Sequence, residues 1–451
     1  MKKIFARKIF QRPAKLVPAF ALLSCIWIVA LFSCKTEQKN PLLQRQVKVK
    51  TGLEVFLESH LDLIKDKKVG LITNPTGTDS NLDITVELFH RNPDINLVAL
   101  YGPEHGVRGN AQAGEYVPFY FDEKYNIPSF SLYGQSMKPA KGMRQNIDAY
   151  MRSFDINQIG KIPQNIMVED LDVLIFDIQD VGTRIYTYIA TLAFAMQACA
   201  ENGIAFIVLD RPNPINGVDM EGPILEFPEF SSFVGLYPIP VRHGMTVGEL
   251  AKYFNDNFFD IKANLTVIPM KNWKREMWFD DTGIPWIIPS PNMPTLNTAT
   301  VYPGQVFLEG TNLSEGRGTT KPFELFGAPW IDGYELAREL NALHLPGIKF
   351  REAWFTPTFS KYKEELCGGT QIHITDRKKY KPFEASLYII KSVMSLYSEQ
   401  FEFHSEYFDK IIGNSKTRDA LKKGHEIKDI ISNYRHELEE FYQVRELFLL
   451  Y

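Results

Sequence analysis

Residues 171–184 read Leu171-Asp172-Val173-Leu174-Ile175-Phe176-Asp177-Ile178-Gln179-Asp180-Val181-Gly182-Thr183-Arg184. The first half is an almost unbroken apolar run, and the second half is polar and contains a glycine. A continuous apolar run, rather than an alternating one, is typical of a strand that is buried on both faces of a parallel sheet. The segment therefore predicts a central strand at 171–177 and a polar loop directly after it.

Further apolar runs of strand length lie on both sides of this segment, with helix-like stretches between them. Residues 185–202 have a helical composition and end before Gly203, and Thr246-Val247-Gly248-Glu249 matches a capping box that opens a helix. Strands that alternate with helices predict an α/β fold with an open, doubly wound and mostly parallel sheet. The other predicted strands are 68–73, 95–101, 204–210 and 265–268.

The sequence pattern changes after residue 271. Prolines crowd residues 285–303, which predicts an irregular stretch without helix or strand. Beyond it, short strand-like pieces mix with longer helix-like segments, as at 370–374, 383–397 and 419–442. We therefore expect two domains, an α/β domain at 51–271 and a smaller α+β domain at 272–451.

The N-terminal residues predict export and a lipid anchor. Residues 1–34 carry six Lys and Arg without Asp or Glu, and their apolar run ends in Leu31-Phe32-Ser33-Cys34, directly before a polar stretch. This layout is that of a secretory signal, and its end resembles a bacterial lipobox, in which Cys34 is lipidated. The competing interpretations are cleavage at Cys25 and an uncleaved membrane anchor. We expect a signal peptide at 1–34, a tether at 35–50 and an envelope protein that faces the periplasm or the exterior.

Composition and charge exclude several functional classes. The chain has 451 residues, of which 45% are hydrophobic and 13% aromatic, an ordinary globular profile. Without the six basic residues of the signal, 44 Lys and Arg face 54 Asp and Glu, and this net charge of -10 argues against nucleic-acid binding. No Walker A motif, no G-x-G-x-x-G after a strand and no H-E-x-x-H is present. We therefore expect no nucleotide cofactor, no other cofactor and no metal.

Polar loops follow four of the predicted strands. Ligands of open α/β sheets bind beyond the carboxyl ends of the strands, so these loops predict one convergent polar site. The loops are residues 74–77, 102–109, 177–184 and 210–214.

Glu104 is the strongest catalytic candidate in these loops. It follows a buried strand directly, in a loop bounded by Gly102 and Gly106, where a partly desolvated carboxyl suits a general acid. The alternative is a structural carboxylate that binds loop amides or pairs with Arg108. Arg184 begins a helix, where its charge opposes the helix dipole, so we expect it to face Asp180 or a substrate carboxylate.

Six segments of the chain, taken in order, resemble one enzyme family. They are residues 70–77, 102–106, 177–184, 210–214, 289–295 and 309–318. Together they are similar to the exo-β-N-acetylmuramidase (NamZ-type) family of peptidoglycan glycosidases, and they run through most of residues 51–451. One variation is Tyr101, where the family pattern leads us to expect Phe.

The resemblance implies a Rossmann-like N-terminal domain, a smaller C-terminal domain that completes a cleft, and release of N-acetylmuramic acid (MurNAc) from the non-reducing end of peptidoglycan fragments. The expected partners are therefore muropeptides or MurNAc-GlcNAc. Glu104 occupies the position of the candidate catalytic glutamate of the family.

Glycoside hydrolysis usually needs a second carboxylate, and Asp180 or Glu315 is the expected partner of Glu104. The lactyl carboxylate of MurNAc calls for a cation, for which we expect Arg184 or Arg317. The other substrate-binding residues that we expect are Asn74, His105, Arg108, Gln179, Asp210, Asn213, His243 and Asn292.

Two other functions compete with this interpretation. A non-catalytic envelope lipoprotein can capture muropeptides in the same cleft, and turnover of substrate distinguishes it from an enzyme. An amidase that cuts the lactyl-peptide bond is the second alternative. The lack of a metal motif and of a G-x-S-x-G nucleophile elbow argues against that alternative.

Overall fold

The computed structural model describes residues 48–133 and 171–451, which belong to one compact unit. The predicted signal peptide, Cys34 and nearly all of the predicted tether lie outside the described residues. Within the described ranges, no helix has both the length and the apolar character that crossing a membrane requires.

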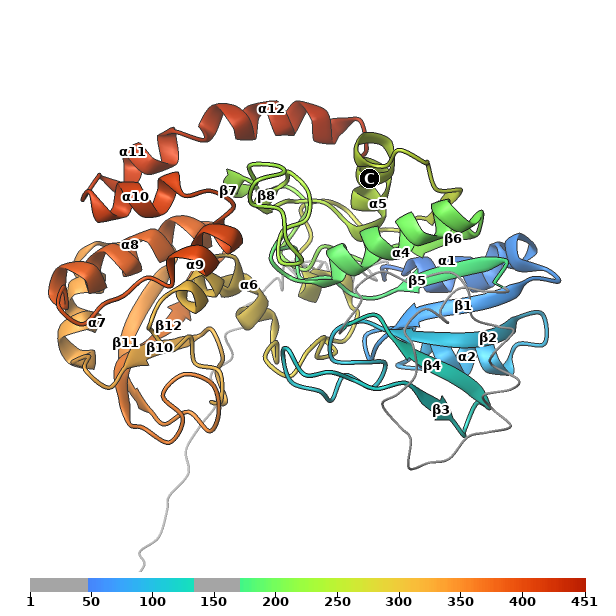
Figure 1. Ribbon diagram of the computed structural model, residues 1–451, viewed down its shortest axis with the longest axis horizontal. Helices are drawn as coiled ribbons and strands as arrows, with labels where there is room; N and C mark the ends of the chain where they lie inside the picture. Colours follow the sequence, from blue (N-terminus) through green and yellow to red (C-terminus); the bar gives the residue numbers. More distant parts are fainter. Residues whose placement is uncertain (1–47, 134–170) are drawn as a thin grey trace, which may run out of the picture. The chain divides into compact units, whose positions relative to one another are not determined.

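A seven-stranded sheet forms the larger half of the described chain (Figure 1). Its strand order is β3-β4-β2-β1-β5-β6-β9, and every neighbouring pair is parallel except β3 with β4. The open, mostly parallel sheet is thereby confirmed, although β3 and β4 were not expected from the sequence. The strands are β1 (Lys68–Thr73), β2 (Asn96–Gly102), β3 (Tyr120–Asp122), β4 (Ile127–Ser131), β5 (Val173–Asp177), β6 (Ala205–Leu209) and β9 (Leu265–Ile268).

Both faces of the sheet are buried under helices (Figure 1). Leu174 and Phe176 of β5 point into one core with α4 (Tyr188–Asn202) and α5 (Val247–Phe258), whereas the alternate residues of β5 pack with α1 (Gly52–Ser59) and α2 (Thr85–Arg91) on the other face. The predicted capping box is present, because Thr246 caps α5 reciprocally with Glu249. Burial on both faces explains the unbroken apolar runs.

The smaller half contains an antiparallel sheet of order β10-β12-β11, with β10 (Leu325–Ala328), β11 (Ile348–Phe355) and β12 (Cys367–Ile374). This confirms the smaller second part with mixed helices and strands. The helices around this sheet are α7 (Gly333–Ala342), α8 (Pro382–Leu396) and α9 (Ser405–Ile412), and a hairpin of β7 (Glu221–Ile224) and β8 (Pro240–Arg242) packs against α8.

Two expectations about helices are wrong. The expected helix at 419–442 is instead three helices, α10 (Lys416–Lys422), α11 (Ile427–Ser432) and α12 (Arg435–Glu446). Gly424 has a left-handed φ of 75°, which turns the chain between the first two. The proline-rich stretch also contains a helix, α6 (Leu296–Gln305), because Thr295 caps its start and Pro303, which cannot donate a helical hydrogen bond, falls only two residues before its end.

Candidate active site

A cavity of about 550 Å³ lies between the two halves of the described chain. The loop after β2, the turn before α4 and the proline-rich stretch form one side. The 3-10 helix η5 (Val306–Gly310), the loops at 317–323 and 359–360 and helix α9 form the other side. Its lining includes Glu104, His105, Tyr133, Tyr186, Thr187, Phe233, Asn292, Tyr302, Glu309, Arg317, Phe323, Phe359, Ser360 and Tyr407.

Glu104 lies in the wall of this cavity, as the sequence predicts. Its Oε1 accepts a 3.0 Å hydrogen bond from the N–H of Gly114, and its Oε2 accepts a 2.7 Å hydrogen bond from the hydroxyl of Thr187. Burial together with the charge and hydrogen bonding of Glu104 raises the pKa of Tyr133 to about 12, so this phenol stays protonated at neutral pH. Three donors from distant segments therefore orient one carboxylate.

His105 is next to Glu104 and lines the same cavity. Its φ is 74°, an uncommon left-handed value for a residue other than glycine. Its Nδ1 lies 2.8 Å from the carbonyl oxygen of Ala111, which can only accept, so Nδ1 carries the proton and Nε2 is left as an acceptor in the neutral ring. Burial lowers the pKa of His105, the charge of Glu104 opposes that effect, and Arg317 adds to it.

The second carboxylate of the cavity is Glu309. Its Oε1 accepts a 2.6 Å hydrogen bond from Nη2 of Arg317, and its Oε2 accepts a 3.0 Å hydrogen bond from the hydroxyl of Tyr407. Among the described residues that line the cavity, Glu104 and Glu309 are the only carboxylates. Glu315, which the sequence offered as a partner for Glu104, is buried behind the wall and pairs with Arg317 and Lys361 at 3.3 Å each.

Arg317 lies in the cavity and is held on three sides. Glu309 and Glu315 bind two of its nitrogens, and its guanidinium lies 5.0 Å from the ring centre of Phe323. Burial alone would lower the pKa of Arg317, but the two carboxylates outweigh it and raise that pKa. No hydrogen bond to Nη1 is present within residues 48–133 and 171–451, which leaves that nitrogen for a ligand.

Arg184 is not in the cavity, which corrects our expectation. Its side chain is buried among the carbonyl oxygens of Pro223, Ile239, Ile411 and Ile412, to which its two terminal nitrogens donate at 2.7–3.1 Å. Burial lowers the pKa of Arg184 to about 9. Arg184 also does not begin a helix, because α4 starts four residues later, at Tyr188. Backbone carbonyls, and not a carboxylate, bind both of its terminal nitrogens, so neither is free to face a substrate.

Asp180 and His243 form a pair outside the cavity lining. Oδ2 of Asp180 accepts a 2.6 Å hydrogen bond from the N–H of Gly182 and lies 3.5 Å from Nε2 of His243. The N–H of Met245 donates to Nδ1 of His243, so the neutral ring carries its proton on Nε2, which lies near Asp180 without a hydrogen bond to it. Both side chains are buried, and neither reaches the cavity described here.

The edge of the sheet where doubly wound folds usually bind ligands is filled by the chain itself. This switch point lies between β1 and β5, because the strand order diverges there. Nδ2 of Asn74 donates to the carbonyl of Pro289, and so does the hydroxyl of Tyr188. The amide of Gln179 donates to the carbonyl of Pro212 at 2.6 Å. Asn74 and Gln179 therefore hold backbone, and the cavity is displaced from the switch point.

Of three other residues expected to bind substrate, one lines the cavity and two lie outside it. Asn292 lines the cavity, where its Nδ2 lies 3.4 Å from Oε1 of Gln112. Asn213 donates to the carbonyl of Met245 and lies outside it. Arg108 is also outside, because its largely exposed side chain pairs with Asp122 at 3.4 Å.

Asp210 belongs to a separate polar cluster at the ends of β6 and β9. Its carboxylate accepts hydrogen bonds from Thr246, Gly248 and Tyr451 at 2.7–2.8 Å. Burial, with a smaller contribution from the charge of Glu249, raises the pKa of Asp210 to about 7.

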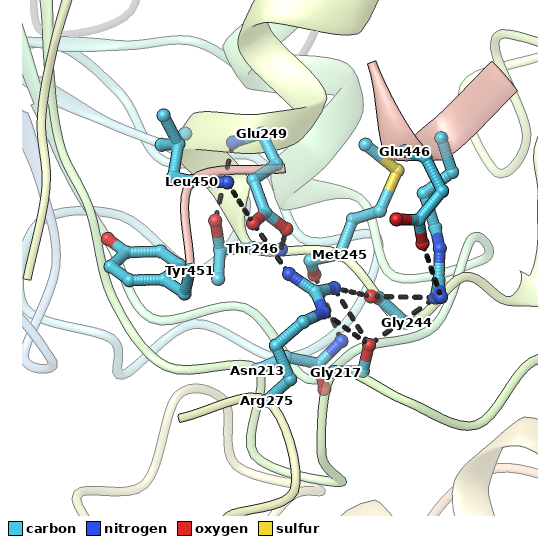
Figure 2. Close-up of polar contacts among 12 residues, drawn as sticks. Asn213, Gly217, Gly244, Met245, Thr246, Glu249, Arg275, Glu446, Leu450 and Tyr451 are labelled. Carbon is cyan, nitrogen blue, oxygen red and sulfur yellow. Dashed lines mark hydrogen bonds and ion pairs between the residues drawn. The ribbon is translucent and has the colours of Figure 1, made fainter. Parts of the chain in front are cut away.

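Figure 2 shows the neighbouring part of this cluster. Glu249 accepts hydrogen bonds from Arg275 and from the N–H of Leu450, and Arg275 also donates to the carbonyls of Gly217 and Gly244. Residues 450–451 are thus fastened beside the strand end where Asp210 lies, and Asp210 has a structural role there.

Sequence reasoning missed the aromatic residues of the cavity. The rings of Tyr186 and Tyr302 are 5.8 Å apart, and those of Tyr302 and Phe323 are 4.8 Å apart, both in edge-to-face contact. Apolar rings between polar groups are what a sugar needs, since a pyranose has C–H faces and a rim of hydroxyls. These residues come from separate segments, so only Tyr186, just past the 177–184 motif, had a signal in the sequence.

Comparisons with known proteins identify the family. Residues 69–162 and 160–297 match the family described as "Exo-beta-N-acetylmuramidase NamZ, N-terminal", and residues 300–451 match its C-terminal counterpart. The chain is 50% identical over 420 residues to "Peptidoglycan beta-N-acetylmuramidase NamZ" of Bacillus subtilis (strain 168), which covers 93% of this chain and 95% of that protein.

Two solved structures of DUF1343 family proteins from Bacteroides fragilis NCTC 9343 share the fold. The first has a TM-score of 0.78 at 37% identity and covers 90% of this chain and 99% of its own. The second has a TM-score of 0.67 at 29% identity, with coverage of 89% and 99%. The matches span both halves of the described structure, and the chain belongs to the exo-beta-N-acetylmuramidase NamZ family.

Proposed function

We propose that this protein is an exo-acting glycosidase that releases β-1,4-linked MurNAc from the non-reducing end of peptidoglycan fragments. The observation that carries the proposal is that Glu104 and Glu309 line one cavity together with aromatic rings. Membership of the NamZ family supports it, as does the 50% identity to a protein named as a peptidoglycan β-N-acetylmuramidase.

The chemistry follows from glycoside hydrolysis with two carboxyl groups. The bond between C1 of MurNAc and the bridging oxygen breaks, Glu104 gives its proton to that oxygen, and a water molecule supplies the hydroxyl at C1. Glu309 is the carboxylate available to stabilise positive charge at C1 or to take the proton of the water. Arg317 and Tyr407 hold Glu309 in position for this role.

We propose that Arg317 binds the lactyl carboxylate, the group that distinguishes MurNAc from N-acetylglucosamine. It is a cation of the cavity wall, and its Nη1 has no partner among the described residues. A guanidinium binds a carboxylate through charge-assisted hydrogen bonds. The neighbouring carboxylates orient Arg317, so little entropy is lost when the substrate binds.

The deciding experiment measures turnover of a chromogenic β-N-acetylmuraminide beside the matching β-N-acetylglucosaminide, and of MurNAc-GlcNAc. We expect many molecules of sugar to be released per protein molecule from the muraminide and from MurNAc-GlcNAc, with little release from the glucosaminide. Saturable binding of MurNAc-GlcNAc without release of MurNAc would instead identify a muropeptide-binding protein.

We also propose that Cys34 carries a lipid anchor that holds the protein in the bacterial envelope, facing the periplasm or the exterior. The basic N-terminal segment and the polarity switch after Cys34 support this proposal. Cys34→Ala should release the protein from membranes while activity on MurNAc-GlcNAc is retained. A variant that stays membrane-bound after a high-salt wash would contradict lipidation at Cys34.

A further inference from the structure

An exposed aromatic surface lies on the small antiparallel sheet. We define the aromatic strip as Tyr362, Trp330, Trp354, Tyr334 and Leu366. Trp354, Tyr334 and Leu366 are 57%, 64% and 60% exposed, which is far more than packing of a core requires. Large apolar side chains that cluster at the surface mark a site of interaction.

The strip begins at the rim of the cavity. The loop at 356–366 joins β11 to β12, and its residues Phe359 and Ser360 line the cavity. Tyr362 follows two residues later, and the indole N–H of Trp330 donates to its hydroxyl at 3.3 Å. The first part of the strip is therefore continuous with the proposed substrate site.

Close backbone packing places Trp354 and Tyr334, at the exposed end of the strip, near the segment that contains Trp330. A Cβ atom at Gly368 would lie 2.1 Å from the carbonyl oxygen of Ile331 and 3.3 Å from the ring of Trp354. Gly368 is the cross-strand partner of Trp354, so no side chain covers the ring from that position. Gly333 packs against the backbone of Gly369 and Ala353, which brings the first turn of α7, with Tyr334, to the same strand pair.

The strip and the loop that joins it to the cavity are held rigidly. Nζ of Lys361 donates to the carbonyls of Leu308, Glu309 and Leu313 at 2.8–3.2 Å. The indole N–H of Trp354 donates to Oε1 of Glu352 at 3.1 Å, which fixes the plane of an exposed ring. A surface that is ordered before binding loses little entropy when a ligand arrives.

We propose that the aromatic strip binds the glycan strand of peptidoglycan beyond the terminal MurNAc. This inference rests on the proposed function. An exo-acting enzyme takes the end of the strand into the cavity, so the rest of the strand must lie on the surface that begins at the cavity rim. Flat, uncharged rings suit the C–H faces of successive pyranose units, and the rigid loop sets the direction in which the strand leaves.

The test compares a short and a long substrate. For the double variant Trp354→Ala/Tyr334→Ala, we expect kcat/KM on peptide-free glycan strands with a MurNAc end to fall about tenfold, as for truncation of an aromatic contact residue. On MurNAc-GlcNAc the same variant should keep its kcat/KM within about twofold, because a disaccharide ends before the strip. Trp354→Phe keeps a ring and should retain most of the activity on strands. Leu447→Ala, at a 76% exposed position outside the strip, is the matched control.

A binding assay separates affinity from turnover. With Glu104→Gln as the background, sedimentation with insoluble peptidoglycan should weaken when Trp354 and Tyr334 are replaced by Ala. Equal kcat/KM of the double variant and the wild type on long strands would overturn the proposal, and so would equal losses on both substrates. A change from dimer to monomer in light scattering of the double variant would assign the strip to a second copy of the chain instead. Failure of the wild type to release MurNAc from MurNAc-GlcNAc would refute the proposed function itself.

Discussion

The hydroxyl of Thr187 donates a 2.7 Å hydrogen bond to Oε2 of Glu104 and joins the turn before α4 to the loop after β2. Two segments more than eighty residues apart thus fix one carboxylate. Thr187→Val removes the donor with little change in volume. We expect kcat on MurNAc-GlcNAc to fall about tenfold, because the carboxyl group of Glu104 is then less well oriented toward the glycosidic oxygen. Thr187→Ser should keep most of the activity, and equal losses in both variants would show that packing matters more than the hydrogen bond.

Glu104→Gln tests the proton donor directly. The substitution removes the proton and keeps the shape, so we expect kcat on MurNAc-GlcNAc to fall by about a hundred- to ten-thousandfold while substrate binding is retained. The fall should be smaller on a nitrophenyl muraminide, whose leaving group departs without protonation. The exposed Glu123→Gln is the control. Near-full activity of Glu104→Gln on the natural substrate would make Glu104 structural.

Glu309 and Glu315 should respond in opposite ways to the same substitution. Glu309→Gln is expected to lower kcat by about a hundredfold or more with little loss of stability, because this carboxylate lines the cavity. Glu315→Gln weakens buried pairs with Arg317 and Lys361 and should lower the free energy of unfolding by about 1.5–3 kcal/mol. Urea unfolding and steady-state kinetics of both variants decide the matter. A larger kinetic defect in Glu315→Gln would reverse the assignment.

The two arginines that the sequence offered for the lactyl carboxylate form a second matched pair. Lysine keeps the charge but loses the planar fork of the guanidinium. Arg317→Lys should reduce the ratio of muraminide to glucosaminide turnover, since Arg317 lines the cavity. Arg184→Lys replaces the two terminal nitrogens that reach four backbone carbonyls by a single nitrogen, so we expect lower thermal stability and unchanged selectivity. Unchanged selectivity in Arg317→Lys would show that Arg317 does not recognise the lactyl carboxylate.

The raised pKa of Asp210 predicts a pH dependence of stability. Its pKa rises from an ordinary 3.8 to about 7 in the folded state. Between these values the unfolded chain ionises Asp210 while the folded chain keeps the proton, so the free energy of unfolding falls as the pH rises from about 4 to 7 and levels off above that. Asp210→Asn should flatten this part of the curve in calorimetry from pH 4 to 8. Parallel curves for variant and wild type would show that Asp210 does not set the slope.

The sequence was sufficient for five of the seven strands of the large sheet, because burial on both faces leaves a local signature, and it did not predict β3 and β4. The apolar runs at 68–73 and 171–177 became β1 and β5, and the loops after the strands did carry Glu104 and His105. The same rule failed for Asn74 and Gln179, because the amide of Asn74 binds the carbonyl of Pro289 in the proline-rich stretch and the amide of Gln179 binds the carbonyl of Pro212 in the loop after β6. Nothing in the local sequence of a polar loop tells whether its side chains bind a ligand or another part of the chain.

The sequence also could not show which glutamate is the second carboxylate of the cavity. Glu309 and Glu315 lie six residues apart in one motif, and their neighbours do not distinguish them. The difference comes from remote contacts, since Tyr407 binds the first and Lys361 pairs with the second. The aromatic lining is unpredictable for the same reason, because Tyr133, Tyr302 and Tyr407 meet only after the fold is complete.

The contacts of Arg184 bear on the order in which the parts of the protein fold. Its guanidinium is enclosed within the first half of the described chain, yet two of its acceptors are carbonyls 227 and 228 residues further along. The seven strands of the large sheet end at Ile268, so a chain up to that residue still lacks half of the partners of this buried cation. Native docking must wait for helix α9, and contacts of such long sequence separation slow folding. We therefore expect the large sheet to reach its native packing only in a chain that includes α9.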